Sequence, residues 1–166
     1  MTIPMAAALY LTFRAHDQSL ALFGAFGFLA AAVLELVRFT ANMALGTLAQ
    51  DFVAASGGQA DAYLAAARAV SLVTITTATL GPMAIALGIF AYGKLIVRTQ
   101  ALPRWIGWIG VVGGAIVPLV WLTYVQQELI FLGFAGLIIG LVFLVTAAVR
   151  LIAGGTDDVA TAEQTA

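Results

Sequence analysis

The sequence predicts an all-α fold: a polytopic transmembrane helix bundle with four spanning helices. Of the 166 residues, 63% are hydrophobic and only 9% are charged, whereas an ordinary soluble domain has about 25% charged residues. So few charges cannot cover the surface of a soluble domain, and a disordered chain needs low hydrophobicity. The mean hydropathy of +1.06 agrees with a membrane protein. Alternating polar and apolar residues are absent, which excludes a β-barrel.

Long runs without charge locate the spanning helices. Twenty-five uncharged residues separate Arg68 from Lys94, 23 separate Arg104 from Glu128, and 21 follow Glu128. Each run exceeds the roughly 20 apolar residues that cross a bilayer. A fourth apolar segment, nearer the N-terminus, is interrupted by two charges. The predicted spans are residues 20–49, 64–95, 105–125 and 129–151.

The two ends of the chain differ from this central domain of residues 20–152. Residues 1–19 form a short apolar N-terminal segment, and its stretch 3–13 is about half a span long. That stretch lies at the interface, packs as a half-helix against the bundle, or is the remnant of a longer span. Residues 153–166 are polar and acidic, and we expect a disordered tail there.

Basic residues orient the bundle. Five of the seven lie beside the same set of predicted helix ends: Arg14, Lys94, Arg98, Arg104 and Arg150. The opposite loops hold Asp51, Asp61 and Glu128. The positive-inside rule therefore predicts a multi-pass protein whose C-terminus is cytoplasmic.

Missing residue types exclude most enzyme chemistry. The chain has no cysteine and one histidine, His16, in a polar stretch, so thiolate and multi-histidine metal sites cannot form within one copy. No phosphate-binding glycine loop and no nucleophile–base pair is visible. A net charge of −1 with scattered basic residues argues against nucleic acid. We expect no enzymatic activity, cofactor or metal.

One group of polar residues lies within the predicted spans. Glu35, Arg38 and Asn42 share one sector of the first helix, near its middle, where a charge costs about 2.5–3.5 kcal/mol. Arg68 and Thr79 of the second helix are expected at similar depths. These five residues predict an intramembrane polar seam. Either Glu35 and Arg38 form an ion pair that fixes helix register, with threonines as interhelical hydrogen-bonding groups, or the seam lines a cavity with Glu35 as a titratable site. The pairing favours the first interpretation.

The last two predicted helices are rich in glycine. Gly110 and Gly114 share one face of the third helix, and Gly136 and Gly140 share one face of the fourth. Small residues four apart allow helix backbones to approach closely. We expect these glycines to pack helices within the chain, with a contact between copies as the alternative.

The junction before the third predicted helix resembles a known family. Basic residues end one helix, and Leu102-Pro103-Arg104-Trp105-Ile106-Gly107 opens the next. This element resembles bacterial multi-pass membrane proteins of domain of unknown function 4386, over about residues 5–152. Members typically have more spans than four. The resemblance implies a bacterial inner-membrane location and no particular activity.

Two functions remain open at this stage. The first is an assembly or accessory membrane subunit, in contact with lipid and forming a homo-oligomer or binding another membrane subunit. The alternative is a small transporter or channel that uses the polar seam. The two halves of the chain do not match as the inverted repeats of a transporter do, which favours the first.

Overall fold

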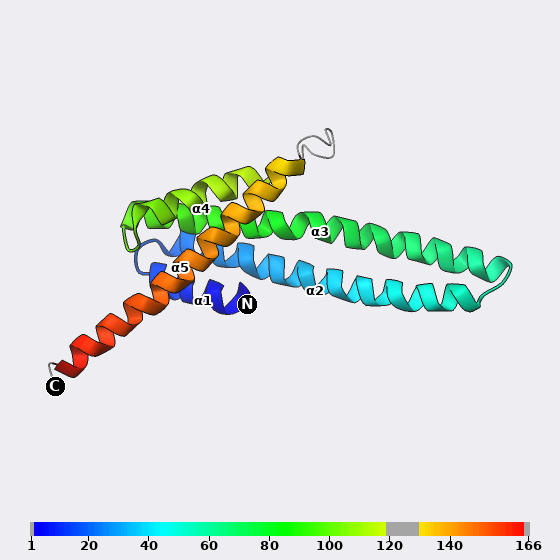
Figure 1. Cartoon of the computed structure of the whole chain (residues 1–166), viewed down its shortest axis with the longest axis horizontal. Coiled ribbons are helices and arrows are strands. Elements are labelled where there is room, and N and C mark those ends of the chain that lie inside the picture. Colours follow the sequence, from blue (N-terminus) through cyan, green and yellow to red (C-terminus); the bar gives the residue numbers. More distant parts are fainter. Residues whose placement is uncertain (1, 119–129, 165–166) are drawn as a thin grey trace.

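The computed structural model describes residues 2–118 and 130–164 and contains five helices there. They are α1 (Thr2–Phe13), α2 (Gln18–Ala54), α3 (Gly58–Thr99), α4 (Arg104–Ile116) and α5 (Ile130–Gln164). The described part of the chain has no β-strand. Figure 1 shows α2 and α3 as a long antiparallel hairpin, with α1, α4 and α5 gathered around one end of it.

Local signals explain where the hairpin helices begin and end. The Asp17 carboxylate accepts a hydrogen bond of 3.0 Å from the backbone N–H of Leu20 and so caps the start of α2. The turn between the two helices contains Gly57, whose positive φ of 60° suits glycine. The left-handed residue Gln100 ends α3, and Pro103 precedes the first residue of α4.

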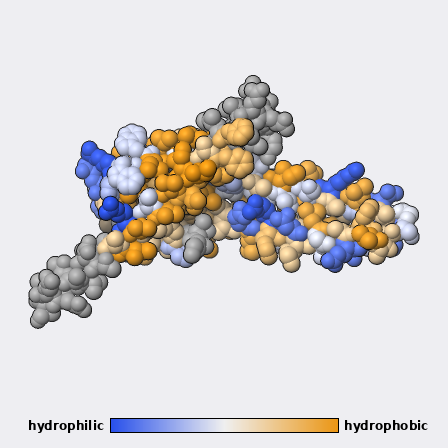
Figure 2. Space-filling model, in the orientation of Figure 1, coloured by the Kyte–Doolittle hydropathy of each residue, from blue (hydrophilic) through white to orange (hydrophobic). Residues whose placement is uncertain are grey.

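The core lies where α1, α4 and α5 surround the hairpin. Its buried apolar residues come from all five helices and include Leu9, Phe28, Ile96, Ile106 and Phe143. We call this part, with the hairpin residues 18–38 and 78–99, the bundle. Figure 2 shows a broad hydrophobic surface over it, with hydrophilic residues at the end away from the rest of the hairpin.

Tyr92 connects three helices at the centre of the bundle. Its fully buried ring stacks on Phe28 with the centroids 6.0 Å apart. The hydroxyl donates a hydrogen bond of 3.1 Å to the carbonyl of Ala21 on α2, and the carbonyl of Ala6 on α1 lies at 3.5 Å. Tyr92 therefore fastens both α1 and α2 to α3.

The rest of the hairpin, residues 39–77, extends past the described ends of α1, α4 and α5 (Figure 1). We call it the arm. With 37 and 42 residues, α2 and α3 are about 55 and 63 Å long. Both exceed the roughly 30 Å of a bilayer's hydrocarbon core, so the hairpin cannot lie within a membrane along its whole length.

Three helical segments are long and apolar enough to cross a membrane: Gln18–Ala54, Gly58–Thr99 and Phe134–Ala153. The prediction of a membrane protein built only of helices thus holds, but its four spans are not confirmed. In the predicted third span, α4 is 13 residues long, which is too short to cross. The remainder of that span, residues 119–125, lies outside the described residues.

The chain ends also differ in part from expectation. The N-terminal segment forms α1, which packs its buried residues Ala6, Leu9 and Phe13 against the bundle. This is the half-helix among the three alternatives. The segment 153–166, expected to be disordered, continues α5 as far as Gln164.

Candidate functional site

Glu35 and Arg38 form an ion pair on α2. A guanidinium nitrogen of Arg38 donates directly to the Glu35 carboxylate, as their spacing of three residues allows. Gly81 of α3 faces that carboxylate, since a Cβ there would lie in ordinary contact with it, at 3.5 Å. Both side chains are about 40% exposed. The pair therefore lies against α3 on one side and is open on the other.

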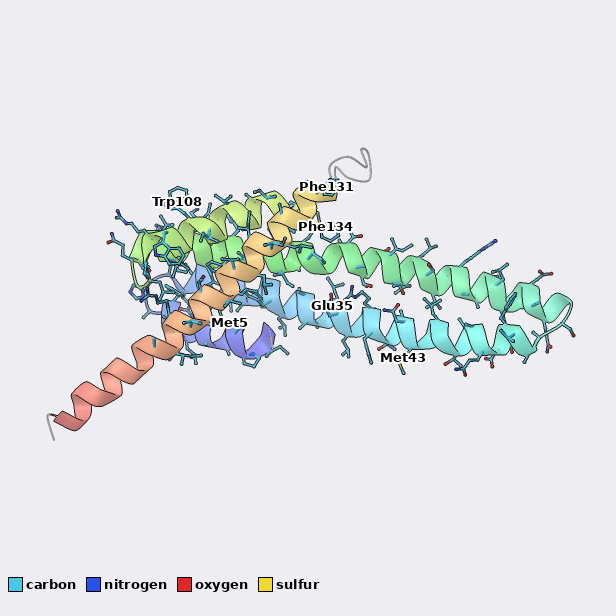
Figure 3. The ribbon with its side chains drawn as sticks, in the orientation of Figure 1. Met5, Glu35, Met43, Trp108, Phe131 and Phe134 are labelled. Atoms are coloured by element: carbon cyan, nitrogen blue, oxygen red, sulfur yellow. The ribbon has the colours of Figure 1, made fainter. Side chains whose placement is uncertain are left out.

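Glu35 and Arg38 lie close to the midpoint of α2. Glu35 is about 26 Å along the axis from the start of α2. If the hydrocarbon core begins at the basic end of the bundle, Glu35 and Arg38 lie near its far boundary, within reach of water. Figure 3 shows Glu35 where the hairpin leaves the bundle, and Met43 farther out on the arm.

The other predicted seam residues do not join the pair. Asn42 and Arg68 are exposed, and Thr79 is half-buried. The ion pairs among the described residues are Glu35–Arg38 and Asp17–Arg98, so Arg68 belongs to neither. The threonines donate to carbonyls of their own helix, as Thr79 does to Ile75 at 2.9 Å and Thr77 to Val73 at 2.8 Å. The hydroxyls of Thr76 and Thr77 thus donate within α3 rather than to α2, because a neighbouring carbonyl of the same helix is closer.

The arm carries two stripes of exposed residues. On α2, a stripe that begins at Leu36, just before the arm, continues through positions 39, 43, 46, 50 and 53 in steps of three and four. All six residues are exposed, and four are large and apolar: Leu36, Phe39, Met43 and Val53. Gly46, in the same stripe, has nothing within 4 Å of where a Cβ would be. On α3, the exposed residues Asp61, Leu64, Arg68, Leu72 and Ile75 follow a similar spacing. This spacing is typical of helices that pack against a partner helix.

Polar and apolar residues intermix on the arm (Figure 2). Asp51, Asp61 and Arg68 are all exposed, and ionised groups do not face lipid without a partner. Large apolar patches on a surface that meets water mark interaction sites. The arm thus combines exposed ionic groups with exposed large apolar residues.

Basic residues gather at the opposite end of the bundle. There the turn after α1, the end of α3 and the start of α4 bring together Arg14, Arg98 and Arg104, and Lys94 lies one turn before the end of α3. Arg98 pairs with Asp17 at 3.4 Å, a contact not expected from the sequence. The sequence indicates only the cap of α2, since Asp17 is a typical cap residue before an apolar helix.

The four predicted packing glycines all lie at helix contacts within the chain. A Cβ on Gly114 would come within 2.7 Å of the carbonyl oxygen of Ala86, and one on Gly110 within 2.7 Å of the Phe143 ring. Gly136 faces Ile116 and Val117 of the α4 end, and Gly140 faces Ile89.

Six described glycines outside that set make equally close contacts. Gly24, Gly27 and Gly88 do so between α2 and α3, Gly93 and Gly107 between α3 and α4, and Gly113 between α4 and α5. Only the fold identifies these six as contact positions.

A cavity of about 290 Å³ lies between α1 and α2, away from the polar seam. Its lining is apolar apart from the hydroxyl of Tyr10: Ile3, Ala6, Ala7, Tyr10, Leu22, Ala25, Phe26 and Leu29. In the described parts of the chain, no three His, Asp or Glu side chains come close enough to hold a metal ion.

Comparison with known proteins gave one result. The family described as "Domain of unknown function (DUF4386)" matches residues 1–155, nearly the whole chain. No curated protein and no solved structure matches the chain.

Proposed function

Since the chain belongs to the family of domain of unknown function 4386, we propose that it is a membrane assembly protein whose arm pairs with the arm of a second copy. It acts as an accessory or structural subunit and has no catalytic role. The observation that carries the proposal is the pair of exposed stripes on the arm, with their three- and four-residue spacing.

Two copies in one membrane share its orientation, so a two-fold axis along the membrane normal relates them. Under that symmetry α2 of one copy runs antiparallel to α3 of the other, and the two arms form a four-helix bundle. Gly46 allows close approach of the second copy's helix. Dimer formation buries the apolar stripes of both copies away from water, which stabilises the dimer.

Charge supports the same arrangement. Asp51 on α2 and Arg68 on α3 belong to neither ion pair of the described structure. The contacts of Gly24 with Tyr92 and of Glu35 with Gly81 set the register of the hairpin. Continued along the arm, this register brings Arg68 about one turn from the level of Asp51. Between copies at equal height, the long Arg68 side chain reaches the Asp51 carboxylate.

The proposal includes a fourth span and a location. We propose that α4 and the residues after it cross the bilayer, so that the basic end and the C-terminus are cytoplasmic in a bacterial inner membrane. The transporter alternative has no specific support, because the cavity does not touch Glu35 or Arg38.

Disulfide crosslinking tests the dimer directly, because the chain has no cysteine of its own. Met43→Cys and Gly46→Cys place one thiol on the α2 stripe, and Ala44→Cys places one on a neighbouring exposed position as the matched control. Under mild oxidation in membranes, we expect a linked dimer from at least one stripe variant and none from the control. No dimer at either stripe position, or equal linking at Ala44, would overturn the proposal.

Native mass spectrometry of the purified protein provides a second readout. Phe39→Ser and Leu72→Ser should lower the dimer fraction at least tenfold, because each removes a large apolar side chain from the interface. Val112→Ser changes an exposed apolar residue on α4, outside the arm, and should leave the dimer intact. Circular dichroism confirms that all three variants remain folded.

A further inference from the structure

The cavity between α1 and α2 has features that the proposed dimer does not use. Four of its lining residues are spaced along α1 (Ile3, Ala6, Ala7 and Tyr10) and four along α2 (Leu22, Ala25, Phe26 and Leu29). It therefore follows the two helices for about 10 Å along their axes. Alanines at three of the eight positions keep the space open, and the side chains around it suit a hydrocarbon ligand.

Polar residues stand at one end of this groove. Arg14 continues the face of α1 that carries Tyr10, one turn further on, and its backbone N–H donates to the Tyr10 carbonyl at 2.8 Å. On α2, Gln18 and Ser19 precede Leu22 by one turn on the groove side. All three side chains are exposed. The groove thus runs from a polar, cationic mouth into an apolar interior.

Arg14 is not neutralised by the nearest carboxylate. Asp17 caps α2 through Leu20 and pairs with Arg98 instead. Lys94, Arg98 and Arg104 add positive charge at the same end of the bundle. A ligand headgroup at the mouth therefore meets a positive potential, which favours an anionic group.

We propose that this groove binds one acyl chain of an anionic phospholipid, with the lipid phosphate at Arg14. The groove lies along the helices, as lipid chains lie along the membrane normal, and its mouth is at the basic end of the bundle, where headgroups of one leaflet are found. The lipid fills the space beside α1 and stabilises the short helix against α2, since α1 is too short to cross the bilayer alone.

Native mass spectrometry of the detergent-purified protein tests the proposal, with phosphatidylglycerol and phosphatidylcholine of identical chains as the two probes. We expect phosphatidylglycerol to be retained in preference. Arg14→Gln should lower the ratio of the two about fivefold, the effect typical of one cation at an anionic membrane surface. Arg104→Gln removes a cation from the same end but outside the groove and should lower the ratio less than Arg14→Gln does.

A second pair of variants tests the groove itself. Ala7→Leu fills space beside Leu22 and Phe26, whereas Ala8→Leu adds the same atoms to an exposed position outside the lining. Only Ala7→Leu should reduce binding of both lipids, by several-fold. Equal retention of the two lipids by the unaltered protein, or identical behaviour of the two alanine variants, would overturn the proposal. Each result is independent of dimer formation at the arm.

Discussion

Gly24 and Tyr92 depend on each other at the centre of the bundle. A Cβ on Gly24 would lie 2.7 Å from the Tyr92 ring, and that ring is fully buried against Phe13 and Phe28. Because the ring cannot move aside, Gly24→Ala should destabilise the protein by about 1–3 kcal/mol.

Gly46→Ala provides the matched control, since Gly46 has open space around it. Alanine there should stabilise α2 by about 0.5–1 kcal/mol. Thermal unfolding in detergent, at a concentration where the protein is monomeric, measures both variants. A lower Tm for Gly46→Ala than for Gly24→Ala would contradict the packing described for Tyr92.

The Glu35–Arg38 pair gives a second prediction at this scale. A half-exposed pair has a coupling energy of about 0.2–1 kcal/mol, whereas a pair enclosed in hydrocarbon would be coupled far more strongly. A double-mutant cycle with Glu35→Gln and Arg38→Gln, measured by thermal unfolding, distinguishes a half-exposed pair from an enclosed one. A coupling energy of several kcal/mol would show instead that the pair lies inside the hydrocarbon of the membrane.

Residues close in sequence were predictable, and residues brought together by the fold were not. The spacing of Glu35 and Arg38 alone places them on one helix face, and the structure shows the ion pair. The contact of Tyr92 with Gly24 joins two helices, and neither residue stands out in its own helix. Threonine hydroxyls were expected to bridge helices, but their own helix supplies carbonyls at 2.8–2.9 Å.

At the scale of elements, the glycine contacts of α4 and α5 differ in kind. A Cβ on Gly114 would meet backbone atoms of Ala86 and Phe90 at 2.7 Å, whereas one on Gly140 would meet only the tip of the Ile89 side chain, at 3.2 Å. Backbone cannot give way as a side-chain tip can. Gly114→Ala should therefore cost at least about 1–3 kcal/mol and Gly140→Ala much less. Comparing their Tm values checks the order, and equal losses would contradict the close α3–α4 contact.

Helix existence was predictable from charge-free runs, but helix length was not. Hydropathy locates the part of a helix that lipid surrounds, and it falls as soon as polar residues appear. The predicted spans 20–49 and 64–95 became α2 (Gln18–Ala54) and α3 (Gly58–Thr99). Asn42, Thr47 and Gln50 lower the hydropathy of the arm but do not end its helix, because no proline interrupts α2.

At the scale of the whole molecule, the length of the hairpin leads us to propose how the protein sits in a bilayer. A hydrocarbon core of about 30 Å accommodates some 20 helical residues. The bundle has apolar helices of this length from its basic end to the level of Glu35 and Gly81. The arm has exposed ionic groups on both of its helices. A membrane around the bundle therefore leaves the arm in water on the side opposite the basic end.

Three single-cysteine variants test this placement: Ala30→Cys and Ala44→Cys, exposed positions on α2, and Gln100→Cys at the basic end. If the membrane surrounds the bundle, Ala44 lies in water. If the membrane is centred on Glu35, Ala44 lies only about 14 Å from the midplane, inside the hydrocarbon. On intact cells expressing the protein, a membrane-impermeant maleimide should label Ala44→Cys and not Ala30→Cys. Gln100→Cys should react only after the cells are permeabilised, since the positive-inside rule makes the basic end cytoplasmic. If Ala44→Cys is not labelled, the membrane is centred on Glu35 instead. If Gln100→Cys is labelled on intact cells, the basic end faces outward and the proposed orientation is wrong.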